Sequence, residues 1–425
     1  MKTSALSLEQ APPLSIPASF FLTIPLGILI AGGILVSLGI TPLLSPWLPQ
    51  SLALTHIGTL GILTMGMMGA LYQMTPVIAG SPVPFMRFAH IVHALLVVGV
   101  AAFIWRLLGG PVWAMSTAMT CFATLSFVFV SLLGLALLRT PAKNETVNGM
   151  RMAVVSLAVI TLIGLFMARG YAGGFFLENR FFWVQIHLTL ALLGWVGGLI
   201  MAVSWQVIPM FYLAPPVSQA TMRWFFWSLL VGLVLPLATV VAVKELDGLA
   251  KPSHLAALAA LPAAFVIWLA HPVLVLRAIA RRKRKRTDVS LWFWKTGLTA
   301  ALFLIPIVVV VFLSNEPRWQ VLFAWVAIWG WAGMIMHGML CRIVPFLVWF
   351  HRYSARVGLE PTPSMRSLLP EAKIKTSFIL HSSSVGLGAV AIGSQADWLA
   401  RLTGLLLLAT AVSLGGTLVH VLKTR

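Results

Sequence analysis

The chain has 425 residues, of which 60% are hydrophobic and only 9% are charged, and its mean hydropathy is +0.97. Soluble globular proteins do not have this composition. A net charge of +19 would fit a nucleic-acid-binding protein, but the basic residues lie in short loops between apolar runs. Basic residues in such loops determine membrane topology, so we expect a lipid bilayer and no nucleic acid as the partner.

Apolar runs of about twenty residues recur from end to end, and each is long enough to cross a bilayer as a helix. A closed β-barrel would instead show short segments of alternating hydrophobicity. The sequence therefore predicts an all-α, multi-pass membrane protein. The twelve expected spans are residues 19–40, 53–77, 87–108, 112–138, 151–168, 181–213, 221–243, 254–279, 290–313, 319–349, 374–394 and 397–421.

Residues 1–18 are polar and contain prolines, which predicts an N-terminal tail. The first apolar run is too long for the core of a signal peptide, so we interpret it as an uncleaved anchor. Three basic loops, residues 139–151, 277–289 and 350–373, fall on one side of a twelve-span arrangement. The positive-inside rule places that side, and both termini, in the cytoplasm of a bacterial-type inner membrane.

Three of the spans share one pattern, and their prolines Pro76, Pro209 and Pro345 are 133 and 136 residues apart. Fifteen residues before each proline stand Gly61, Gly194 and Gly330, and eight residues before it stand Met68, Met201 and His337. A repeat of this length indicates three copies of a larger unit. We expect one membrane domain, residues 19–421, built from four-helix units of about 19–138, 151–279 and 290–421. The second helix of each unit should be innermost.

His56 and His187 begin the first two of these helices, twenty and twenty-two residues before the proline. A two-residue offset turns a helical side chain by roughly 200°, so the two imidazoles could face each other across a gap. Two neutral imidazoles in an apolar slot suit axial ligation of a heme iron. The alternative is that both are interfacial histidines that contact water and lipid headgroups.

His337 stands mid-membrane where both equivalents are methionine. An unpaired polar group is costly there, so it should have a partner. It could ligate a second heme or a metal, or donate a hydrogen bond to a neighbouring carbonyl. His271, His381 and His420 could join it in an inner cluster, or be three scattered histidines.

Other candidate ligands are weaker. His90 and His93, three residues apart, could hold a metal on one helical face, although Arg87 nearby favours an interfacial role. Met65 begins a methionine-rich stretch that would suit copper(I), but methionine is also ordinary membrane-core packing.

Two arginines at outer span ends, Arg180 and Arg318, could bind heme propionates through bidentate hydrogen bonds, or extend to the headgroups. The ten acidic residues all lie in tails, loops or span ends. Ion-coupled transporters usually bury a carboxylate, so this distribution argues against that class.

The twelve-helix layout with histidines on the second helix of a unit resembles subunit I of the heme-copper oxidases. The stretches MGMMGALYQMTPVIAGSPVP and HLTLALLGWVGGLIMAVSWQVIPMF are similar to the second and tenth helices of that family. Met65 stands at the family's second-helix ligand position. The sixth span lacks the His-Pro-Glu-Val-Tyr segment and the seventh has no histidine, which argues against a dioxygen-reducing copper–heme centre. The NnrS-like branch is closer, because its early histidine, glycine-rich helix and proline match His56 through Pro76.

This resemblance implies a heme protein, with b-type heme, possible copper and an electron-donor protein as partner. It implies electron transfer or a response to nitric oxide or another respiratory gas, and an oxidoreductase if the chain is an enzyme. The alternative is a membrane transporter or assembly factor for copper, heme or another small solute, which the methionines and basic loops favour.

Overall fold

The computed structural model describes residues 11–174, 180–242, 252–283, 288–314, 316–364 and 367–423. These residues form helices and no strand, and twelve helical spans are long and apolar enough to cross a membrane. The predicted all-α multi-pass fold is therefore confirmed. Residues 1–10 of the expected tail and residues 284–287 of the most basic loop lie outside the described residues.

Each span overlaps its predicted range. The spans are Ser15–Leu38, Pro49–Ala79, Phe88–Leu107, Val112–Arg139, Glu145–Gly173, Arg180–Tyr212, Gln219–Thr239, Leu261–Ala280, Ser290–Leu313, Pro317–Arg356, Glu371–Ser394 and Asp397–Lys423. The three spans that carry the repeat are the longest, at 31, 33 and 40 residues. They are also the most buried: 67–78% of their most apolar stretch is buried, against 22–50% in the other nine. Such burial is expected of inner helices.

Each repeated span is an α-helix interrupted by a π-helical stretch, and the shared glycine lies inside that stretch. The first copy is α2 (Pro49–His56), η3 (Ile57–Thr64) and α3 (Met65–Ala79). The second is α7 (Arg180–Leu188), η4 (Thr189–Gly197) and α8 (Gly198–Tyr212). The third is α14 (Pro317–Trp325), η6 (Val326–Gly333) and α15 (Met334–Tyr353). π-Helical turns are rare and often mark functional sites, so their recurrence at one position of the repeat is notable. One further π-helical stretch, Val266–Ala270, lies outside the repeat.

The chain divides into two compact units. Unit 1 comprises residues 1–11, 74–106 and 111–285, and unit 2 comprises residues 12–73, 107–110 and 286–425. Besides the second repeated span, unit 1 holds α4 (Phe88–Leu107) up to Arg106, α5 (Val112–Arg139), α6 (Glu145–Gly173), α9 (Gln219–Ala242), α10 (Pro252–Ala259), α11 (Leu261–Phe265), η5 (Val266–Ala270) and α12 (His271–Ala280). Besides residues 49–73 of the first repeated span and the whole of the third, unit 2 holds α1 (Ser15–Leu38), η2 (Thr41–Leu43), α13 (Ser290–Leu313), η7 (Ser354–Arg356), α16 (Glu371–Ser394) and α17 (Asp397–Lys423). The last part of the first repeated span, residues 74–79, belongs to unit 1.

In unit 1, α6 packs against η4 and α8. Asn144 caps the start of α6, because its Oδ1 accepts a hydrogen bond from the Val147 amide at 3.0 Å. Arg151 ties α6 to the end of α5 by donating from Nε and one Nη to the Leu137 carbonyl, at 3.0 and 2.7 Å. These local bonds place α6 beside the second repeated helix.

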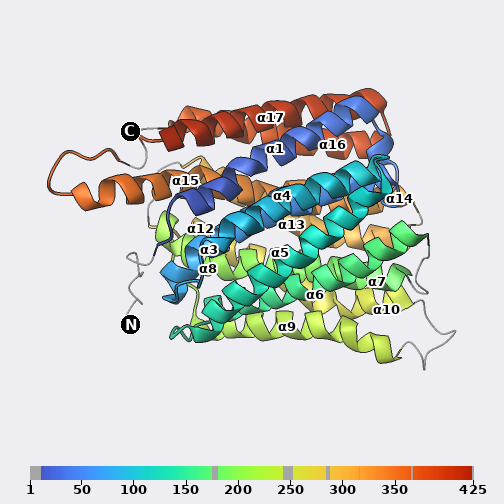
Figure 1. Cartoon of the computed structure of the whole chain (residues 1–425), viewed down its shortest axis with the longest axis horizontal. Helices are drawn as coiled ribbons and strands as arrows, with labels where there is room; N and C mark the ends of the chain where they lie inside the picture. Colours follow the sequence, from blue (N-terminus) through green and yellow to red (C-terminus); the bar gives the residue numbers. More distant parts are fainter. Residues whose placement is uncertain are drawn as a thin grey trace. The chain divides into compact units, whose positions relative to one another are not determined.

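In unit 2, α1 and α16 each pack along α17 (Figure 1). Where α1 crosses α17, a Cβ on Gly404 would lie 2.7 Å from the Gly32 carbonyl oxygen, so the backbones of these two helices are in direct contact. Small residues at such crossings let membrane helices approach closely. Beside this contact the Asp397 carboxylate accepts from the Ile40 amide at 2.9 Å and from Arg401 Nε at 2.7 Å.

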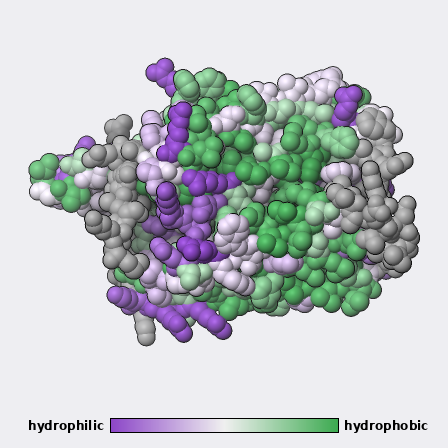
Figure 2. All heavy atoms as spheres, turned by 90° about the horizontal axis from the view of Figure 1, so that it is seen from below, coloured by the Kyte–Doolittle hydropathy of each residue, from purple (hydrophilic) through white to green (hydrophobic). Residues whose placement is uncertain are grey.

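Large hydrophobic side chains gather over much of the face shown in Figure 2. On α9, for example, Trp224, Trp227 and Val231 are exposed although they are strongly apolar. Lipid contact explains such exposure, which water would not favour. Among the described residues no carboxylate is buried, in agreement with the position of the acidic residues in the sequence.

Candidate functional site

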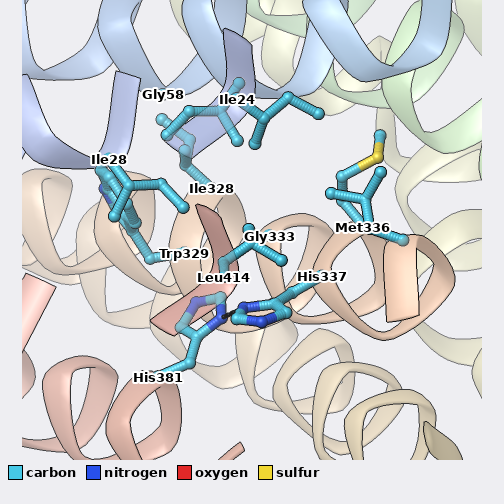
Figure 3. Close-up of a pocket in the computed structure, with 12 residues that line it drawn as sticks. Ile24, Ile28, Gly58, Ile328, Trp329, Gly333, Met336, His337, His381 and Leu414 are labelled. Carbon is cyan, nitrogen blue, oxygen red and sulfur yellow. Dashed lines mark hydrogen bonds between the residues drawn. The ribbon is translucent and has the colours of Figure 1, made fainter. Parts of the chain in front are cut away.

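Two buried histidines meet in unit 2. His337 on α15 and His381 on α16 are 2% and 3% exposed, and their Nδ1 atoms lie 3.0 Å apart (Figure 3). The ring centroids are 5.1 Å apart and the planes are inclined by 34°, so the rings meet through their nitrogen-bearing edges and are not stacked. Both residues belong to the third repeat unit, residues 290–421.

A hydrogen bond between two neutral imidazoles requires a proton on one Nδ1 and a lone pair on the other. The donor ring then has a lone pair at Nε2, and the acceptor ring has an N–H there. The backbone carbonyl of Trp329, in η6, lies within reach of the His381 ring. Neither Nε2 atom, however, completes a hydrogen bond within the described part of the chain. The pair thus offers one donor and one acceptor.

A small cavity adjoins the pair. It is lined by both histidines and by side chains of α1, η3, η6, α15 and α17, among them Ile28, Trp329 and Met336 (Figure 3). None of the lining residues is charged. The cavity has a volume of about 10 Å³, which is close to the minimum for one water molecule. It has room for a single small guest.

Glycines bring the helices around this cavity together. A Cβ on Gly58, in η3, would lie 2.5 Å from Cγ2 of Ile328, in η6, so only glycine allows this approach of the two π-helical stretches. A Cβ on Gly338 would lie 2.4 Å from the Cβ of Phe293, on α13. The absence of a side chain there lets the Phe293 ring pack on the His337 ring, with centroids 4.7 Å apart. The position of His337 is therefore set by its glycine neighbour.

The pair fits a hydrogen bond better than it fits a metal ion. Imidazole nitrogens bind metals at about 2.0 Å, so an ion would separate two of them by about 3.3 Å in tetrahedral coordination and by about 4 Å in linear coordination. The observed separation is 3.0 Å. Within the described residues no group of three or more His, Cys, Asp or Glu side chains could hold a metal. A porphyrin is far larger than this cavity.

The predicted hydrogen bond from His337 to a neighbouring carbonyl is wrong for Nδ1, because this atom is hydrogen-bonded to His381. Ligation of a second heme or metal by His337 stays a prediction. The sequence named His381 only as a member of a possible cluster.

His56 ends α2 and directly precedes η3. Its Nδ1 lies 2.7 Å from the carbonyl oxygen of Leu52, and the side chain is half-buried. Since a carbonyl only accepts, Nδ1 carries the proton and Nε2 carries the lone pair. This is the usual arrangement of an imidazole that ligates a metal.

His187 lies two residues before η4, also half-buried. A Cβ on Gly164 of α6 would be 3.2 Å from its Cε1, so α6 leaves space for the ring. Joint ligation of one heme by His56 and His187 stays a prediction.

The remaining candidate ligands are His90, His93, Met65, Arg180 and Arg318. His90 is exposed and His93 is half-buried on α4, and Met65 is buried at 1% exposure. The Arg180 guanidinium lies 4.7 Å from the centre of the Phe181 ring. Arg318 Nε is 3.8 Å from the carboxylate of Glu316. Their expected roles as cofactor ligands stay predictions.

A second buried histidine contact lies in unit 1 and was not predicted. Ser204 Oγ donates to the Met201 carbonyl at 2.7 Å and lies 2.8 Å from His271 Nε2. Because the serine proton is used, His271 donates through Nε2. This arrangement satisfies the buried ring and leaves the serine without the properties of a nucleophile. No sequence pattern links these two residues.

No family model matches the chain, and no curated protein matches it.

Proposed function

We propose that the chain is a heme-binding membrane protein that transfers electrons or responds to nitric oxide or another respiratory gas. One observation carries this proposal: the 2.7 Å contact between His56 Nδ1 and the Leu52 carbonyl. It holds the imidazole in the tautomer that an axial heme ligand needs.

The donor set at this position fits a heme iron, since a neutral imidazole nitrogen is a common axial ligand. A heme bound there would supply one-electron chemistry. The contribution of the chain is to orient His56 and fix its proton at Nδ1. The proposed second ligand is His187, and the proposed propionate partners are Arg180 and Arg318.

The position of the two histidines along their helices supports this assignment. His56 immediately precedes η3, whereas Leu188 stands between His187 and η4. His56 is thus the last residue of an α-helical segment and His187 the last but one, where the backbone changes register. Because π-helical turns often accompany functional sites, a histidine within two residues of such a turn in both copies supports the proposal.

The test is the absorption spectrum of the purified, full-length protein from cells supplied with a heme precursor. We expect a Soret band and, on reduction, the split visible bands of a low-spin heme. His56→Ala and His187→Ala should each remove this spectrum, while the exposed His420 changed to alanine should keep it. A colourless wild-type protein would refute heme binding, and copper in that preparation would favour the transport or assembly alternative.

The proposed orientation places both termini and the loop that contains Lys283 in the cytoplasm. Its basis is the number of basic residues between Arg277 and Arg286, which are hard to translocate and favour an anionic inner leaflet. A cysteine at Lys283 should not react with an impermeant thiol reagent in intact cells. Reaction there would invert the topology and move His56 to the cytoplasmic side.

A further inference from the structure

We propose that His337 and His381 form a proton relay in the membrane-spanning part of unit 2. The pair has an acceptor and a donor at its two Nε2 atoms, which have no hydrogen-bond partner among the described residues. An Nδ1–H···Nδ1 hydrogen bond of 3.0 Å joins the rings, and a cavity with room for one water lies beside them. This activity does not depend on a heme.

The transfer balances in protons and bonds. A proton from water forms an N–H bond at the Nε2 lone pair of the first ring. The Nδ1–H bond of that ring then breaks, and its proton forms a new N–H bond at Nδ1 of the second ring. The Nε2–H bond of the second ring breaks and its proton passes to water. One proton enters, one leaves, and no atom is oxidised or reduced.

The surroundings of the pair favour transient protonation over a permanent positive charge. The residues that line the cavity and the Phe293 ring on His337 carry no charged group. A permanent imidazolium would be costly in such surroundings, because none of the residues that line the cavity is an anion. A charge that enters one ring and leaves the other is present only during transfer. Buried ionisable side chains within membrane helices commonly serve as such relays.

The exchange of tautomers also prevents a continuous leak of protons through the pair. One passage exchanges the tautomers of both rings and reverses the direction of the hydrogen bond. A second proton cannot follow in the same direction until the rings turn over or a proton returns. The Phe293 ring, 4.7 Å from His337, and the crowded helices around it oppose turning. The pair therefore moves one proton forward and one back.

The test uses full-length protein with ¹⁵N-labelled histidine in lipid bilayers, without heme. Nitrogen NMR should show a scalar coupling between two Nδ1 atoms across a shared proton. His337→Gln and His381→Gln should each abolish this coupling, and His420→Gln should leave it. After transfer into D₂O, the shared proton should exchange faster than the backbone amides of α15, whose exchange requires opening of the helix.

Two results would overturn the proposal. A coupled pair whose shared proton exchanges no faster than those amides would be a structural hydrogen bond only. Absence of the coupling, with histidine resonances that shift when silver(I) is added, would indicate a metal site. Both decisive measurements use the wild-type protein, so they stand even if a variant fails to fold. Because they need no heme, they can fail without affecting the heme proposal, and the reverse also holds.

Discussion

Replacing Gly404 with alanine tests whether the backbone contact between α1 and α17 holds unit 2 together. The new Cβ would lie 2.7 Å from the Gly32 carbonyl oxygen and 2.8 Å from the Val36 amide nitrogen. Ordinary contact begins near 3.4 Å, so α17 would have to move by about 0.7 Å. Both neighbours are backbone atoms of a helix, and neither can turn aside as a side chain would.

The magnitude follows from two opposing effects. Overpacking of this kind costs about 1–3 kcal/mol. Alanine in place of glycine within a helix stabilises it by about 0.5–1 kcal/mol. Gly416→Ala, on the same helix, is the matched control, because nothing lies within 4 Å of its Cβ. Both variants gain the same helix propensity, so this gain cancels when they are compared. They should then differ by about 1–3 kcal/mol in the free energy of unfolding.

The assay is equilibrium unfolding of the wild type and both variants in mixed micelles, followed by tryptophan fluorescence. Gly416→Ala should be as stable as the wild type or more so, and Gly404→Ala should be clearly less stable than Gly416→Ala. Equal stability of the two variants would show that α1 and α17 do not touch at Gly32 and Gly404.

Three further variants test other contacts. Gly39→Ala should lower the free energy of unfolding by about 1–2 kcal/mol in the same assay, because Gly39 has φ of 59° and a Cβ there would overlap the Asp397 carboxylate. Ser204→Ala should cost about 1–3 kcal/mol, since it leaves the buried His271 Nε2–H without its acceptor; no loss would mean that the contact does not form. Gly338→Ala should weaken or abolish the Nδ1–Nδ1 coupling, because its Cβ would lie 2.4 Å from a side-chain atom of α13; an unaltered coupling would show that α13 does not set the position of the pair.

The spans could be predicted because the thickness of a bilayer demands long apolar runs, whatever the helices pack against. The π-helical stretches could not be predicted, since a shift in hydrogen-bond register leaves no composition of its own. Their presence changes the geometry expected for His56 and His187. The 200° offset between His56 and His187 assumes a continuous α-helix from each histidine to its proline. That assumption is wrong, because η3 and η4 intervene.

The candidate site was predictable in part. His337 departs from the methionines at equivalent positions and stands where an unpaired polar group is costly, so the existence of a partner followed from the sequence. The identity of the partner did not, because His381 is 44 residues away on another helix and only the packing of α15 against α16 joins them. For His56, the hydrogen bond to Leu52 could have been found, because a side chain and a carbonyl four residues apart share one helical face.

The contact of α1 with α17 has a consequence for biosynthesis. The two helices are separated by the 358 residues between Leu38 and Asp397, and synthesis at 5–20 residues per second needs roughly 20–70 s for that length. Throughout this interval the face of α1 that carries Gly32 is in the membrane without its native neighbour. Lipid or another protein must cover it until α17 is inserted. Unit 2 therefore closes late, and a stop codon before Asp397 would leave α1 with an open face that quality-control proteases can recognise.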